Sequence, residues 1–144
     1  MKATELYDRD FVLWAEENAG LLRAGRIQDA DLPHIAEEIG DMGKERQHAL
    51  KSHLRALLSH LLKHQFQPSR RSTSWLRTIA NARAEIEDLL EENPSLAPLV
   101  APLAVAPYPR SAKLAAIETK LPASRFPARC PYTVKQIRDD AYLA

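Results

Sequence analysis

Cysteine and glycine are scarce in this sequence. A single cysteine, Cys130, stands among 144 residues, so no internal disulfide can form. Together with the lack of a basic, apolar leader after Met1, this predicts a reducing, cytoplasmic compartment. Only 4 glycines occur and runs of β-branched residues are absent, so local propensity favours helix almost everywhere before Pro94.

A long hydrophobic run is also missing. The most apolar stretch covers residues 96–106 and is interrupted by Pro98 and Pro102. A membrane-spanning helix needs roughly 20 apolar residues. The sequence therefore excludes such a helix, and we expect no membrane partner.

The most unusual absence is that of Asp and Glu between residues 46 and 84. This block holds 8 basic residues and no acidic one, whereas residues 1–45 hold 11 acidic and 5 basic residues. Residues 85–144 are nearly balanced, with 8 acidic and 7 basic residues. Opposite charges attract within a Debye length of about 10 Å. Packing of the acidic block against the basic one would therefore explain the pattern without any ligand.

Apolar residues at helical spacing begin near the N-terminus. The first predicted helix covers residues 11–22 and is stopped by Gly25. The second follows Asp31, whose carboxylate is expected to cap the first turn. Gly40 and Gly43 then mark either a kink or a break, because each costs roughly 1 kcal/mol relative to Ala inside a helix.

A leucine stripe over residues 50–62 predicts a central packing helix that ends near Pro68. Ser72 or Thr73 is expected to cap the next helix, which ends at Pro94. The prolines that follow permit only short helical pieces, because each removes an amide donor and clashes with the preceding turn. Residues 111–121 should recover as helix, and Thr133 should cap a last short one.

The predicted fold class is all-α, a single-domain bundle of four to six helices. Residues 1–93 form its regular core. Residues 94–144 form a Pro-rich, partly irregular segment whose apolar side chains are too numerous for a disordered tail, so we expect it to pack on the bundle.

One set of residues spread over nearly the whole chain is specific in combination, although no member is specific alone. The set comprises Leu6, Tyr7, Asp10, Phe11 and Trp14; Leu21 to Gly25; Ala36, Glu37, Glu38, Ile39 and Gly43; Leu57 to Lys63 with Gln67 and Pro68; Arg71, Ser72, Ser74, Trp75, Thr78 and Ile79; and Cys130 to Thr133. In these residues the chain resembles the bacterial Domain of Unknown Function family twenty-nine. The resemblance implies an α-helical bundle and, by the family's own description, no assigned activity.

A candidate anion-binding site lies at the expected start of the fourth helix. Free backbone N–H groups, hydroxyls and guanidinium groups are the donors that hold phosphate or sulfate. The alternative is that a serine simply caps the helix while the arginines pair with acids on a neighbouring helix. The candidate residues are Lys63, Arg70, Arg71, Ser72, Ser74 and Arg77.

A wider version of this hypothesis treats the whole basic block as a nucleic-acid surface, since phosphate contacts need a clustered basic footprint. The basic residues are spread around two helices, and no recognised binding module or interleaved aromatic set accompanies them. The pattern therefore favours a protein partner or a small anionic ligand over nucleic acid.

Histidines form a second candidate site. At about 100° per residue, His53, His60 and His64 fall within about 40° of each other on one helix, as metal ligands would. They border the leucine stripe, where histidines are more often structural, so the first expectation is no metal and no cofactor. Glu38, paired with His60, Arg55 or Arg77, would instead form a buried polar network that fixes helix register. Trp75, which is also a candidate for this network, is most simply a core anchor.

The sequence therefore favours a binding or interaction module and assembles no catalytic set. A metal-dependent hydrolase that uses the histidine stripe is one alternative. A structural protein that dimerises through its first or last helix is another. The sequence does not fix the oligomeric state.

Overall fold

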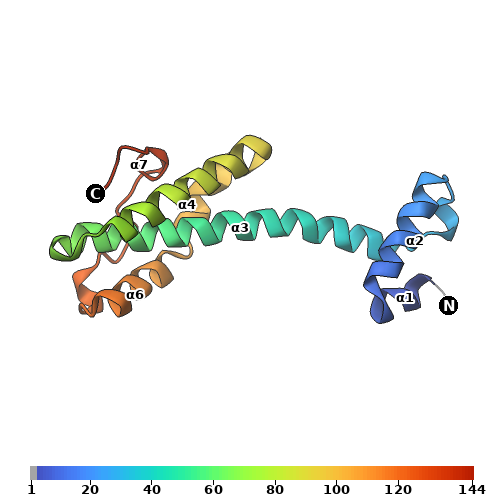
Figure 1. Cartoon of the computed structure of the whole chain (residues 1–144), viewed down its shortest axis with the longest axis horizontal. Helices are drawn as coiled ribbons and strands as arrows, with labels where there is room; N and C mark the ends of the chain where they lie inside the picture. Colours follow the sequence, from blue (N-terminus) through green and yellow to red (C-terminus); the bar gives the residue numbers. More distant parts are fainter. Residues whose placement is uncertain (1–2) are drawn as a thin grey trace. The chain divides into compact units, whose positions relative to one another are not determined.

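The computed structural model describes residues 3–144 and, within them, contains seven α-helices and no strand (Figure 1). The contacts divide the chain into two compact units, Met1–Glu45 (unit 1) and Arg46–Ala144 (unit 2). The boundary lies inside a helix. The all-α prediction is confirmed, with one helix more than the four to six expected.

Unit 1 contains two short helices, a 3₁₀ turn and the start of a long helix: α1 (Ala3–Arg9), α2 (Phe11–Arg23), η1 (Ile27–Asp29) and α3 (Leu32–Phe66). Asp10 caps α2, because its carboxylate accepts the backbone N–H of Leu13 at 3.0 Å. The sequence pattern missed α1. Gly25 follows α2 with φ +73, a left-handed conformation that glycine adopts without a steric penalty.

The helix α3 runs through Gly40 and Gly43 without a break. The sequence predicted either a kink or a break at these glycines. The helix continues across both glycines, so the break does not occur. A Cβ atom added at either position would meet no atom within 4 Å. Neither glycine is therefore required by a close contact in the described structure.

Unit 2 begins in α3 and contains the remaining elements: η2 (Pro68–Arg70), α4 (Thr73–Glu92), η3 (Pro94–Leu99), α5 (Val100–Val105), α6 (Tyr108–Thr119), η4 (Ala123–Arg125) and α7 (Val134–Arg138). Capping residues and prolines close to each helix end account for most of the boundaries of these elements. Ser72 caps α4 by accepting the N–H of Trp75, and Thr133 forms a full capping box with Gln136, as these residue types favour. The helix α6 starts three residues before the predicted 111, because a proline such as Pro109 is tolerated in a first turn.

The core of unit 2 is built on the leucine stripe of α3, with α4 and α6 flanking that helix (Figure 1). Leu50, Leu54 and Leu57 have no exposed surface. The core is completed by Leu58, Leu61, Leu62, Ile79, Ala82, Ile86, Leu89, Leu90, Leu96, Val100, Ala104, Tyr108, Ala115, Phe126, Tyr132 and Ile137. Because the last eight of these, from Leu96 onward, come from the C-terminal segment, the prediction that this segment packs on the bundle is confirmed.

Membrane-spanning helices are not found. None of the helices within residues 3–144 combines the length and the apolar character needed to cross a bilayer.

Candidate functional site

The predicted anion site falls at η2 and the first turns of α4. Arg70, Ser74 and Arg77 are exposed there. The Ser72 hydroxyl is occupied as the cap of α4, and the Arg71 Nε–H donates to the carbonyl of His64 at 2.8 Å. Two of the candidates thus have structural roles, while three exposed side chains remain available to a ligand.

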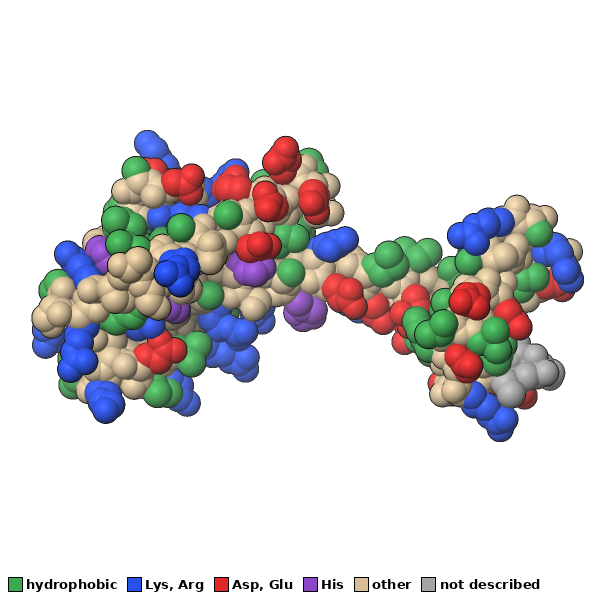
Figure 2. Space-filling model, in the orientation of Figure 1, with side chains coloured by type: hydrophobic (Ala, Val, Ile, Leu, Met, Phe, Trp, Pro, Cys, Tyr) green, Lys and Arg blue, Asp and Glu red, His purple; other side chains and the backbone are tan. Residues whose placement is uncertain are grey.

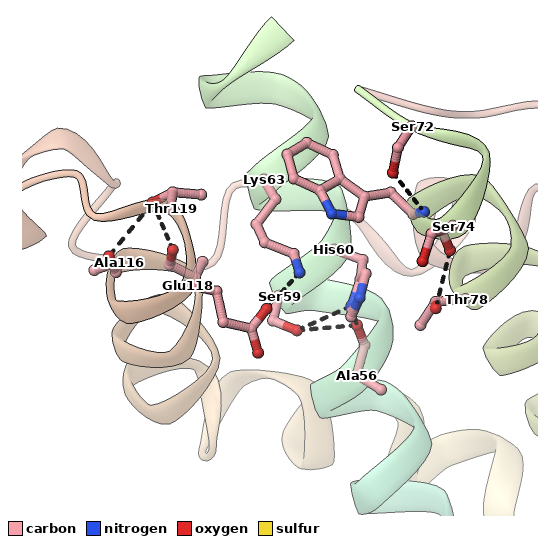
Figure 3. A network of polar contacts seen from close by, with 12 residues as sticks. Ala56, Ser59, His60, Lys63, Ser72, Ser74, Thr78, Ala116, Glu118 and Thr119 are labelled. Carbon is pink, nitrogen blue, oxygen red and sulfur yellow. Dashed lines mark hydrogen bonds and ion pairs between the residues drawn. The ribbon is translucent and has the colours of Figure 1, made fainter. Parts of the chain in front are cut away.

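Lys63, the sixth candidate, is buried in a separate cluster. Its ammonium group, on a side chain that is 6% exposed, donates to the Glu118 carboxylate of α6. It also lies 5.2 Å from the centre of the Trp75 ring, so that a cation–π contact adds to the ion pair. Figure 3 shows Lys63 and Glu118 pointing toward each other between α3 and α6. The positive charge of Lys63 is therefore balanced by Glu118 inside unit 2.

His60 lies beside this cluster. Its Nδ1–H donates to the carbonyl of Ala56 at 2.8 Å, and the Ser59 hydroxyl lies 3.3 Å from the same nitrogen (Figure 3). Burial lowers the pKa of His60, and the positive charge of Lys63 acts in the same direction against a smaller rise from the Ala56 hydrogen bond. His60 is accordingly a neutral, structural histidine at neutral pH.

The histidine stripe does not assemble into a ligand set. His64 is buried and donates through Nδ1 to the carbonyl of Ala144 at 3.1 Å, and His53 is half-buried between α3 and α4. Within residues 3–144, no group of three or more His, Cys, Asp or Glu side chains is placed to hold a metal ion. Backbone carbonyls occupy the Nδ1 atoms of both His60 and His64.

Glu38, His60 and Trp75, the predicted polar network, are divided between the two units. His60 and Trp75 belong to unit 2, whereas Glu38 belongs to unit 1 and accepts a hydrogen bond from the Tyr7 hydroxyl. This bond, together with burial, raises the pKa of Tyr7 to about 12.

Glu38 lies next to a buried polar network in unit 1 that is centred on Asp31. The Asp31 Oδ2 atom accepts the Trp14 indole N–H at 3.0 Å and the His34 Nδ1–H at 2.6 Å. Asn18 accepts the backbone N–H of Asp31 at 2.8 Å, and the Tyr7 ring stacks on His34 with centroids 3.8 Å apart. Asp31 is 4% exposed, and its Oδ1 atom is buried without a partner.

The pKa of Asp31 is set by two opposing effects. Burial raises it, but the hydrogen bonds from His34 and Trp14 favour the carboxylate and hold the pKa below its ordinary value. From the sequence, Asp31 is predicted only as a helix cap. The Asp-x-x-His spacing at the start of α3 was the available signal, whereas the partner Trp14 lies 17 residues away and could not be identified from spacing.

A second basic surface was missed by sequence reasoning. Arg55 of α3 and Arg110 and Lys113 of α6 line one groove of about 290 Å³ together with the apolar Leu114 and Ile117. None of the three cations forms an ion pair within unit 2. Figure 2 shows Lys and Arg gathered over the part of unit 2 that α6 forms, and Asp and Glu at the C-terminal end of α4.

Nucleophilic chemistry finds little support in these side chains. Burial raises the pKa of the Cys130 thiol, so the thiol is protonated at neutral pH and is a poor nucleophile. The described surface instead carries exposed Lys and Arg side chains, which can bind anionic groups through hydrogen bonds and charge.

Comparison with protein families gives a match over nearly the whole chain. A family model described as "Domain of unknown function DUF29" matches residues 6–143. This chain belongs to the DUF29 family. The match covers both units, and the description of DUF29 assigns no activity. No curated protein and no solved structure matches the chain.

Proposed function

We propose that this DUF29 protein is a cytoplasmic binding module, not an enzyme, and that it binds anionic groups at the start of α4. One observation supports this. Of the eight basic residues in 46–84, Lys63 alone has a carboxylate partner within unit 2, and Arg83 donates to backbone carbonyls. The other six have no ion-pair partner in unit 2: Arg46, Lys51, Arg55, Arg70, Arg71 and Arg77.

Different candidates have different roles in this proposal. Arg70, Ser74 and Arg77 are exposed and would contact the anion. Arg71 keeps its two terminal nitrogens for the ligand, because only its Nε is bonded within the fold. Ser72 shapes the helix start as its cap, and Lys63, already paired, would add no net charge.

The test is a thermal unfolding series with sodium pyrophosphate and, separately, a short single-stranded oligonucleotide. Ligand at about a hundred times its Kd adds about 2.7 kcal/mol, which should raise Tm by several degrees. The double variant Arg70→Gln, Arg77→Gln should lose the shift. Arg125→Gln, which removes an exposed charge from η4, should keep it.

Other outcomes would change the proposal in defined ways. Loss of the shift in Arg55→Gln, Arg110→Gln, but not at α4, would move the site to the groove between α3 and α6. A shift with oligonucleotide alone, weakening steeply with salt, would replace the small anion by nucleic acid. An unchanged Tm with both probes would refute anion binding.

A second candidate function is self-association through unit 1, and it is favoured by one apolar face of α3. Leu32, Ile35, Ile39 and Met42 follow the three-and-four spacing of coiled-coil helices. Leu32 is 45% exposed, and Ile39 and Met42 are each 64% exposed. The open glycines of the same helix would let the same segment of a second copy approach closely.

Light scattering over a range of concentrations tests this second candidate. The wild-type chain should gain mass toward a dimer as its concentration rises, and Ile39→Ser with Met42→Ser should remain a monomer. Val105→Ser, which changes an exposed apolar residue of unit 2, is the matched control. A wild-type monomer at the highest concentration would rule this candidate out.

A further inference from the structure

A cavity between α4 and the segment after α7 contains a buried cation that lacks a carboxylate partner. The cavity has a volume of about 370 Å³ and is lined by Arg83 together with acidic and apolar side chains of both elements. Its size lies at the lower end of the range for small-molecule sites. Its lining includes none of the residues proposed to bind an anion at the start of α4, so the site does not depend on the proposed function.

Arg83 is 2% exposed, which is exceptional for a guanidinium group. Its Nε–H donates to the carbonyl of Ile137 at 2.9 Å and its Nη2 to that of Gln136 at 3.0 Å. Its Nη1 is buried and has no hydrogen-bond partner. No carboxylate lies within ion-pair distance of the guanidinium group. Burial lowers the pKa of Arg83, and the negative charges of Asp140 and Asp139 offset this effect only in part. An acceptor that carries negative charge would therefore satisfy the unused Nη1–H donor.

Two exposed carboxylates on the cavity wall can hold a group of the opposite charge. Asp88 of α4 and Asp140 line the cavity and form no ion pair within unit 2. Glu87, the third acid there, is already held by Arg138 through two hydrogen bonds of 2.8 and 2.9 Å. A simple anion would be repelled by the two free aspartates, and a simple cation would leave the Arg83 donor unpaired.

The rest of the wall is apolar. Leu76 and Leu143 stand at the cavity with 41% and 37% of their surface exposed, and Ile79 is buried beneath them. A ligand side chain that covered the two leucines would remove apolar surface from water, which favours binding. The cavity thus combines one unused cation, two unpaired carboxylates and an apolar wall.

We propose that this cavity binds a free α-amino acid with an apolar side chain. Its carboxylate accepts the Arg83 Nη1–H, its ammonium group lies between Asp88 and Asp140, and its side chain packs on Leu76 and Leu143. Because Nη1 is shielded from solvent, the segment that carries Asp140 and Leu143 shifts when the ligand enters.

Calorimetric titration of the full chain with three matched probes tests the ligand class. The probes are L-leucine, 3-methylbutylamine, which is leucine without its carboxylate, and 4-methylpentanoate, which is leucine without its amino group. Each is raised to about 10 mM, enough to saturate a site of millimolar affinity. Leucine should bind at least about tenfold more tightly than either analogue, because each analogue leaves one charged group of the site unpaired.

Variants test the placement of the ligand. Asp140→Asn should weaken leucine binding about tenfold or more, and Leu143→Ser should weaken it as well. Glu85→Gln is the matched control, because Glu85 is an exposed acid of α4 that does not line this cavity. Arg83→Lys keeps the positive charge but loses the forked donors, and it should also weaken binding if circular dichroism shows that it stays folded.

Three results would overturn the proposal. Equal affinity for 4-methylpentanoate and leucine would show that the aspartates do not bind the ammonium group. No heat with any of the three probes would refute the site itself. Loss of binding in Glu85→Gln but not in Asp140→Asn would place the ligand elsewhere.

Discussion

Asp31 carries much of the polar organisation of unit 1. Its carboxylate joins Trp14 of α2 to His34 of α3, and its backbone N–H is held by Asn18. A carboxylate that is buried and hydrogen-bonded in this way contributes to stability only while it is ionised. The unit should therefore respond to acid through this one side chain.

We expect unit 1 to lose stability at acid pH because the pKa of Asp31 is lowered in the fold. The carboxylate contributes its full stabilisation above its ordinary pKa of 3.8 and loses it as the pH falls through the lowered value. Trp14 fluorescence in a Trp75→Phe background, followed while the pH is lowered from neutrality, measures the loss. Asp31→Asn should be less stable at neutral pH and should show a flatter acid limb. Identical acid limbs in both proteins would contradict the assignment.

The Lys63–Glu118 pair should respond unequally to removal of its two partners. Glu118→Gln leaves the buried ammonium group without a counter-charge and should lower the free energy of unfolding by about 1–3 kcal/mol. Lys63→Met removes the buried charge and leaves a Glu118 that is 48% exposed and can be hydrated. We expect that change to cost less than about 1 kcal/mol. Urea denaturation of both variants measures the difference, and equal losses would show that burial of Lys63 is not the dominant cost.

At the scale of elements, the long helix α3 contains two residues that disfavour helix in its interior. Gly40 and Gly43 lower helix propensity in its interior, yet the helix continues through both of them. Since open space surrounds both Cβ positions, the described structure gives no steric reason for glycine. These glycines are therefore the positions where a local change should stabilise the helix.

Gly43→Ala should raise the free energy of unfolding by about 0.5–1 kcal/mol, because alanine restricts the unfolded backbone and favours helix. Thermal or urea unfolding followed by circular dichroism measures the change, at a concentration where the chain is monomeric. The matched reversal Ala36→Gly, at an exposed position of the same helix, should lower stability by a similar amount. A loss of stability in Gly43→Ala would indicate a close contact at this position.

At the scale of the whole molecule, apolar burial is unequal between the units. Leu6 and Trp14 are the buried hydrophobic residues in the described part of unit 1, whereas unit 2 buries a cluster of 19. Hydrophobic burial is the main source of stability, so unit 1 should open at a lower free-energy cost than unit 2.

Hydrogen exchange measures this difference directly. Backbone amides in residues 54–62 of α3 should exchange only through global unfolding of unit 2. Amides in residues 12–23 of α2 should exchange at least about tenfold faster, because each 1.4 kcal/mol of local stability changes the rate by a factor of ten. Equal protection in the two stretches would mean that the chain unfolds as one cooperative body.

Local physics explains the parts of this protein that its sequence predicted correctly. The start of α4 at Ser72 or Thr73, the end of α3 near Pro68 and the cap at Thr133 depend on residues within one or two turns. The leucine stripe of α3 likewise fixes which face is buried through spacing alone. The composition and pattern of the chain were therefore sufficient for the helical class and for most helix ends.

Side-chain partners that lie far apart in sequence were decided only by the tertiary structure. Lys63 was predicted as an anion ligand, but α6 brings Glu118 to it from 55 residues away. Arg83 was one of eight basic residues in a charged block, and only the packing of α7 buries it and leaves its Nη1 unpaired. The position of a charged residue along the sequence does not reveal whether its side chain is solvated or buried, because burial depends on which distant element packs over it. For that reason the sequence alone determined most of the helices, and the fold decided which cations remain free to bind.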